Sequence, residues 1–223
     1  MNESISVSTT RHATTWATRG LLILLALCGV VAAASAGAGS GAEIDEVARS
    51  TQAAASVPLP FIGVLLAVDV RRAASVDRAG VFRHRALVSA ALAIGVALAG
   101  LVAATIAAQD AASGDVLRLL PGCVTVQLVS QGIGFGFGLL IGTRWLAMLL
   151  DAVVPVGLWA LVGAAGLTGA QHWLFPYDSV DDLISPHPTA LDWAQEGLVV
   201  LLWVVGTVVA GLLLLRRNGA GQA

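Results

Sequence analysis

Long runs of apolar residues, separated by shorter polar stretches, divide this chain. Because a helix that spans a bilayer needs about 20 mostly apolar residues, each long run is a candidate transmembrane helix. Proline near the start of the second run is tolerated in the first turn of a helix. The pattern predicts an all-α polytopic membrane protein with six transmembrane helices: Gly20–Gly39, Ala53–Val70, Ala86–Ala108, Gly122–Ile141, Trp145–Thr168 and Ala194–Leu215.

The composition indicates the same class of protein. Of the 223 residues, 57% are hydrophobic and 12% are charged, with a mean hydropathy of +0.84, whereas soluble domains carry roughly 25% charged residues. The net charge of −2 gives no reason to expect a nucleic-acid partner. The two cysteines, Cys28 and Cys123, lie in apolar surroundings and do not indicate a disulfide framework.

The first apolar run has two interpretations. Arg19, a leucine-rich stretch and a run of small residues resemble a signal peptide with its cleavage site. The polar leader before Gly20 is long for a signal peptide, which favours a retained helix. We therefore divide the chain into a cytoplasmic or interfacial N-terminal segment (1–19), a six-helix transmembrane domain (20–217) and a cytoplasmic tail (218–223).

The placement of arginine predicts the orientation. Cytoplasmic flanks of membrane helices carry an excess of Lys and Arg. Alternate flanks here hold ten of the twelve arginines, and most acidic residues lie on the opposite flanks. Both termini are therefore expected in the cytoplasm of a cell-membrane protein, with these inner arginines: Arg11, Arg19, Arg71, Arg72, Arg78, Arg83, Arg85, Arg144, Arg216 and Arg217.

All twelve basic residues are arginines, and the absence of lysine excludes several activities. A phosphate-binding P-loop needs its lysine, and Schiff-base catalysis needs a lysine amine. We therefore expect no enzymatic activity and no cofactor in this chain. Any ATP and Mg²⁺ that the protein uses would be bound by a partner subunit.

A polar connection from about Arg71 to Arg85 follows the second predicted helix. In one interpretation its arginines only keep the loop inside and bind anionic headgroups of membrane lipid. In the other, the loop forms a short amphipathic helix that docks on a cytoplasmic partner. The charged candidates for this coupling are Arg71, Arg72, Asp77, Arg78, Arg83 and Arg85.

Asp151 is the most informative single residue, because it lies about two turns into the fifth predicted helix. A carboxylate within the bilayer costs roughly 2.5–3.5 kcal/mol and needs a partner or water. Pro155 lacks an N–H, so the carbonyl of Asp151 loses its helical hydrogen bond. Two interpretations remain: a locally polar point on a substrate path, or a structural ion pair with Arg144 near the interface.

The fourth predicted helix carries two sets of residues spaced by four. Gln127 and Gln131 share one face, and they are candidates for a polar stripe along a substrate path. Gly134, Gly138 and Gly142 allow another helix to approach closely, and close packing is the interpretation we favour for this helix.

The outer connection between the last two helices contains four candidate metal ligands. His172, Asp178, Asp181 and His187 do not have the spacing of a helical zinc motif, and we expect no metal site. The aromatic residues of this connection indicate instead a segment that lies at or dips into the interface.

The whole pattern resembles the permease subunits of ATP-binding-cassette exporters of the second (type-two) class. The shared features are six helices, an arginine-rich turn after the second helix, a long outer segment before the sixth and the closing sequence from Leu212 to Asn218. Gly142-Thr-Arg-Trp-Leu-Ala, followed by Val154-Pro-Val-Gly, is also typical. Asp69 and Arg83 take the places of the Glu and Arg of the family's turn, whereas its Gly-Thr, Pro and Lys are missing.

The resemblance implies an assembly of two permease chains, identical or different, with two ATPase subunits. The inner loop would be the coupling helix that docks on the ATPase, and Thr9–Thr18 would be an interfacial helix. The outer segment would hold short re-entrant helices. The expected function is export of a lipophilic or amphipathic substrate; the alternatives are an intramembrane or outer-face metal-dependent enzyme and a non-transporting membrane scaffold or immunity protein.

Overall fold

The computed structural model describes residue 29 and residues 43–73, 78–108, 113–176, 182–185 and 187–220, and the regular structure in these ranges is helical. The predicted helix Gly20–Gly39, apart from residue 29, and the predicted interfacial helix Thr9–Thr18 lie outside the described residues. The helices are α2 (Ile44–Ser56), α3 (Leu59–Arg72), α4 (Arg78–Ala108), α5 (Ser113–Leu140), α6 (Arg144–Ala164), α7 (Thr168–Leu174), α9 (Ala190–Val199), the π-helix η1 (Val200–Val205) and α10 (Gly206–Ala220).

Five helical segments in the described part of the chain are long and apolar enough to cross a membrane. They overlap with the second to sixth predicted helices, and they indicate a membrane protein. They are Ile44–Arg72, Arg78–Ala108, Val116–Leu140, Arg144–Ala164 and Ala190–Arg217.

The helix bounds differ from the predicted ones where a helix continues beyond its apolar part. The second segment starts at Ile44 rather than Ala53, and α4 starts at Arg78 rather than Ala86. The inner connection is therefore confined to residues 73–77, shorter than the predicted Arg71–Arg85. Hydropathy locates the part of a helix that suits the bilayer, whereas the backbone hydrogen bonds continue into the polar flank.

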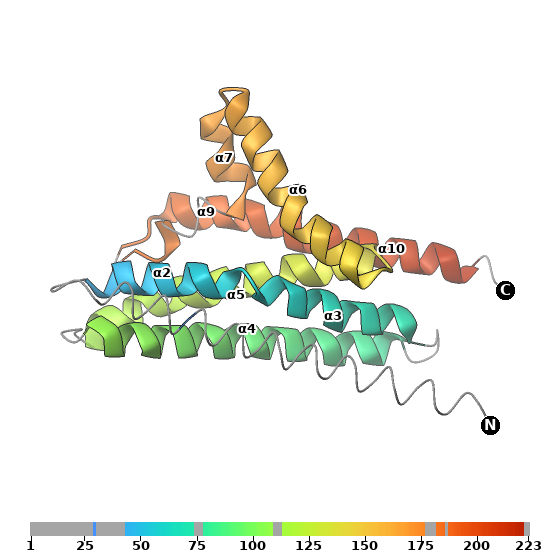
Figure 1. The fold of residues 1–223 in the computed structure, drawn as a ribbon, viewed down its shortest axis with the longest axis horizontal. Helices are drawn as coiled ribbons and strands as arrows, with labels where there is room; N and C mark the ends of the chain where they lie inside the picture. Colours follow the sequence, from blue (N-terminus) through green and yellow to red (C-terminus); the bar gives the residue numbers. More distant parts are fainter. Residues whose placement is uncertain are drawn as a thin grey trace.

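Helix α5 lies at the centre of the bundle and packs against α2, α3, α4, α6, η1 and α10. Helices α2 to α5 and the segment from α9 to α10 run along the long axis of the molecule (Figure 1). Helix α6 leaves this direction at a steep angle and carries α7 at its far end. Gln171 of α7 donates a hydrogen bond of 2.9 Å to the carbonyl oxygen of Trp159, so α7 folds back on α6.

Glycines bring α3 and α5 into backbone contact. A Cβ atom at Gly134 would lie 2.0 Å from the carbonyl oxygen of Pro60, and one at Gly138 would lie 2.7 Å from that of Val64. Both glycines therefore have the packing role that their spacing predicts. Gly142 does not, because it is exposed and an added Cβ would have only ordinary contacts, the nearest at 3.5 Å.

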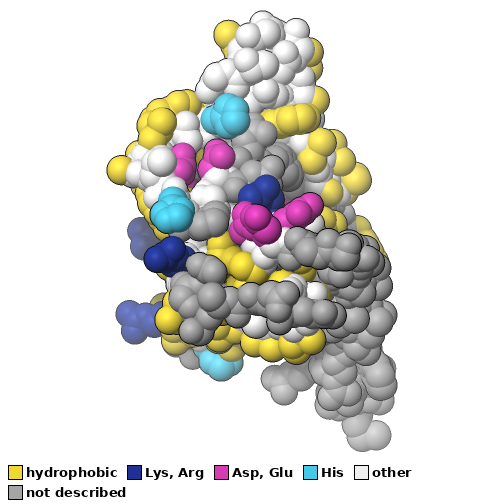
Figure 2. All heavy atoms as spheres, turned by 90° about the vertical axis from the view of Figure 1, so that its left-hand side faces the viewer, with side chains coloured by type: hydrophobic (Ala, Val, Ile, Leu, Met, Phe, Trp, Pro, Cys, Tyr) yellow, Lys and Arg dark blue, Asp and Glu magenta, His cyan; other side chains and the backbone are white. Residues whose placement is uncertain are grey.

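The described ends of the helices separate by charge. The end of α3 and the starts of α4 and α6 lie towards the same end of the molecule as the end of α10 (Figure 1), and we call this the arginine end. It carries Arg71 and Arg72 on α3, Arg78, Arg83 and Arg85 on α4, Arg144 on α6, and Arg216 and Arg217 on α10. Figure 2 views the opposite end, where carboxylate groups lie near histidine side chains and arginine side chains are also visible.

Cysteine labelling tests the predicted orientation. In a background with Cys28→Ala and Cys123→Ala, an impermeant maleimide added to sealed cells should label Glu46→Cys but not Ala79→Cys. Both positions are exposed and lie at opposite ends of the bundle, and the excess of arginine predicts that the second end lies inside. Ala79→Cys should react only after permeabilisation; its labelling in sealed cells would contradict the orientation.

Candidate functional site

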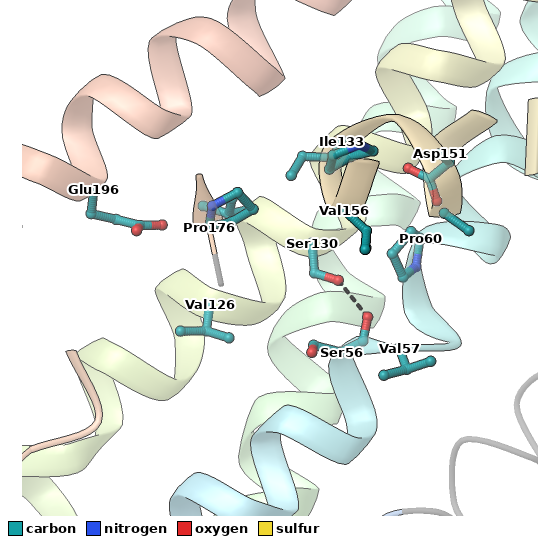
Figure 3. Close-up of a pocket in the computed structure, with 13 residues that line it drawn as sticks. Ser56, Val57, Pro60, Val126, Ser130, Ile133, Asp151, Val156, Pro176 and Glu196 are labelled. Carbon is teal, nitrogen blue, oxygen red and sulfur yellow. Dashed lines mark hydrogen bonds between the residues drawn. The ribbon is translucent and has the colours of Figure 1, made fainter. Parts of the chain in front are cut away.

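A cavity of about 250 Å³ lies among α2, α3, α5, α6 and α9, within the apolar part of the bundle (Figure 3). We call it the central cavity. Valine, isoleucine, alanine and proline side chains form most of its wall. The polar side chains that line it are Ser56, Ser130, Asp151 and Glu196.

Prolines lie in the helices that form the cavity wall. Because Pro60 has no N–H, the carbonyl oxygen of Ser56 loses its helical partner at the break between α2 and α3. The hydroxyl of Ser130 on α5 donates to this carbonyl oxygen at 2.7 Å (Figure 3). Pro155 of α6 also lines the cavity, one turn after Asp151. The predicted polar point on α6 is therefore part of the cavity wall.

The carboxylate of Asp151 is buried in this wall, with 5% of the residue exposed. Its Oδ1 atom has no hydrogen-bond partner among the described residues. No ion pair between Asp151 and Arg144 is seen among the described contacts, so that interpretation stays a prediction. Arg144, at the start of α6, lies within electrostatic range of Asp69 and Arg72 at the arginine end.

Glu196 is a second buried carboxylate at the cavity, with 3% of the residue exposed. Charge patterning alone groups it with the outer acidic residues. A capping box formed by Thr189 and Asp192 starts α9 at Ala190, so Glu196 lies nearly two turns inside the last spanning segment. Its position within the predicted helix Ala194–Leu215 is the signal that identifies it.

The two glutamines predicted to line a path lie in different environments, and neither lines the central cavity. Gln127 donates to the backbone carbonyl of Gln52 at 2.9 Å and to its side-chain oxygen at 2.7 Å. Gln52 in turn donates to the carbonyl oxygen of Ala97 at 2.9 Å. This fully buried network joins α2, α4 and α5. Gln131 lines a separate cavity of about 180 Å³ between α4, α5 and the last span.

The predicted coupling residues are divided between internal contacts and solvent. Arg71 donates to the carbonyl oxygens of Leu139 and Leu140 at the end of α5, and Arg85 forms an ion pair of 3.1 Å with Asp69.

The other coupling candidates have fewer internal restraints. Arg78 contacts the carbonyl oxygen of Ala73 at 3.5 Å, whereas Arg72 and Arg83 are exposed. Asp77 lies outside the described residues. Of the described coupling candidates, Arg72 and Arg83 are therefore available to a partner, whereas Arg71 and Arg85 join α3 to α5 and α4.

The candidate metal ligands of the outer connection do not form a site in the part that the structure describes. His172 and His187 are exposed, and Asp178 and Asp181 lie outside the described residues. No group of three His, Cys, Asp or Glu side chains suited to a metal ion occurs among the described residues.

The outer connection is attached to the bundle on both sides of the undescribed stretch. Leu183 and Ile184 are fully buried against the start of α5, and a Cβ at Gly122 would lie 2.1 Å from the Leu183 carbonyl oxygen. The indole of Trp203, in the π-helix η1, donates to the carbonyl oxygen of Leu174 at 2.6 Å. Residues before and after α9 thus attach the outer connection to the helical bundle.

No family model, no curated protein and no solved structure matches this chain.

Proposed function

We propose that this chain is the permease subunit of an ATP-driven exporter in the cell membrane, and that it moves a lipophilic or amphipathic substrate. The observation that carries the proposal is the central cavity, because its wall contains Asp151 within a helix long enough to span the membrane. An ionisable side chain at membrane depth is costly and marks a substrate or ion path. Interrupted helices around such a site are typical of transporters.

The arginine end supports the second half of the proposal, the dependence on an ATPase. Arg72 on α3 and Arg83 on α4 are exposed, and the Asp69–Arg85 ion pair joins the same two helices. A force applied at this surface would reach α3, which forms part of the cavity wall through Pro60. Transport would then be an ATP-driven shift between two arrangements of the helices.

The remaining features of the proposal follow from the sequence pattern and the resemblance. They are six membrane-spanning helices with both termini inside, a re-entrant outer segment, and two permease chains for each pair of ATPases. The attachment of Leu183 and Ile184 to α5 is compatible with an outer segment that closes the exit.

Substitution of Asp151 tests the proposed function. Asp151→Asn keeps the shape of the side chain and removes its charge, so export should fall at least tenfold while the ATPase remains bound. The measurement is ATP-dependent uptake of a panel of fluorescent amphipathic dyes into inside-out membrane vesicles, with vesicles that lack the chain as the baseline. Asp45→Asn, an outer-end carboxylate paired with Arg49, is the control and should transport normally.

Purification from native membranes provides the second half of the test. A stoichiometric ATPase should accompany both the native chain and Asp151→Asn. The function is refuted if no ATPase accompanies the native chain, or if its vesicles take up none of the dyes above the baseline.

A further inference from the structure

The polar groups that face the central cavity are hydrogen-bond acceptors. The hydroxyl of Ser130 donates to the carbonyl oxygen of Ser56, and the hydroxyl of Ser56 donates to that of Ala53 at 2.8 Å. A hydroxyl has one proton to donate and two lone pairs, so both serines have only acceptor capacity left. The two remaining polar side chains, Asp151 and Glu196, are carboxylates, and no basic side chain lines the cavity among the described residues.

Asp151 provides a buried acceptor atom for a positively charged ligand. Its Oδ1 atom is buried without a hydrogen-bond partner in the described structure, which is a costly state for a carboxylate. Its neighbours in the wall include Ala152, Pro155 and Val156, none of which donates a side-chain hydrogen bond. A cation in the cavity would satisfy this oxygen, whereas an anion would face the Asp151 carboxylate, with no basic side chain among the described residues that line the cavity.

The lining and volume of the cavity limit the polarity and size of a molecule that could bind there. Asp151 and Glu196 lie on opposite sides of the cavity, with Ile133, Val156 and Pro176 between them (Figure 3). A charged head at Asp151 therefore leaves an apolar surface for a hydrophobic body. The volume of about 250 Å³ is just below the range of roughly 300–1,000 Å³ for drug-sized sites, so the bound portion is small.

We propose that the central cavity binds a small amphipathic cation, with its charged head against the carboxylate of Asp151 and its apolar body against the wall between α5 and α6. This inference rests on the proposed function, because it names the substrate class of the same cavity.

Binding to the purified full-length protein tests the inference without requiring transport. The probe is benzyltrimethylammonium, and its neutral control is neopentylbenzene, in which a carbon atom replaces the nitrogen. Calorimetric titration in detergent should show saturable binding of the cation to the native chain. Asp151→Asn should weaken this binding at least tenfold, because the desolvated ion pair is lost, whereas neopentylbenzene should not discriminate between the two proteins.

Two further variants distinguish a loss of the binding site from a loss of folded protein. Asp45→Asn, outside the cavity, should retain the affinity for the cation. Ala152→Phe adds a ring from an exposed position in the cavity wall, and it should reduce binding of both the cation and the neutral probe. Size-exclusion profiles and thermal midpoints identify any variant that fails to fold, and Ala152→Phe then provides the test if Asp151→Asn is unstable.

The outcomes separate this inference from the proposed function. Equal binding of the cation to the native chain and Asp151→Asn, or preference for benzenesulfonate as an anionic probe, overturns the inference. If ATP-dependent export persists in that case, the permease function stands with another substrate class. If the cation binds as expected but no ATPase or export is found, the cation site stands and the exporter function is wrong.

Discussion

Replacing Gly134 with alanine should largely abolish recovery of folded protein. The added Cβ would lie 2.0 Å from the carbonyl oxygen of Pro60 and 2.5 Å from its carbonyl carbon. These are backbone atoms, so no flexible side chain can move aside, and α3 and α5 must separate. We expect a loss of stability on the order of 3 kcal/mol or more. The thermal midpoint and the monodisperse fraction after extraction measure it.

Two glycines provide matched controls for this substitution. Gly95 on α4 and Gly157 on α6 have nothing within 4 Å of an added Cβ. Alanine at either position should leave the thermal midpoint unchanged or raise it slightly, because alanine favours a helix over glycine by roughly 1 kcal/mol. Gly63 is the reciprocal test, since its Cβ would lie 2.5 Å from the Gln131 carbonyl oxygen. Native stability of Gly134→Ala would show that α3 and α5 do not pack in this way.

Reversing two exposed charges at the arginine end should release the ATPase partner that we propose. The double variant Arg72→Glu with Arg83→Glu places carboxylates where an acidic partner surface would bind guanidinium groups. We expect retention of the ATPase during purification to fall more than tenfold, and ATP hydrolysis to lose its coupling to export. The internal contacts of Arg71 and Arg85 are left intact, so the helix ends themselves should hold together.

The matched control reverses Arg216 and Arg217, which are exposed at the end of α10. This variant changes the charge of the arginine end by the same amount, and it therefore reproduces any effect on orientation. Labelling at Ala79→Cys must show the native orientation in both variants. A correctly oriented Arg72/Arg83 variant that keeps its ATPase and exports at the native rate would leave these arginines only a topological role.

The sequence by itself determined the class of the protein and the positions of its apolar helices. These depend on local properties, because about 20 consecutive residues must match the bilayer and flanking arginines must stay on one side. Five of the six predicted helices therefore correspond to segments able to span a membrane. The polar point at Asp151 and Pro155 was also predictable, since a carboxylate and a proline are conspicuous in an apolar run, and so was close packing at Gly134 and Gly138.

The tertiary structure alone decided which of these residues act together. Ser130, Asp151 and Glu196 line one cavity although they lie on three different helices. Gln127 and Gln131 share a helix face, but Gln127 is hydrogen-bonded to Gln52 and Gln131 lines a separate cavity. The sequence likewise does not distinguish Arg71, which caps α5, from exposed Arg72. The reason is geometric: spacing along one helix defines a face, but the helices packed against that face determine whether a polar group meets a partner, a cavity or solvent.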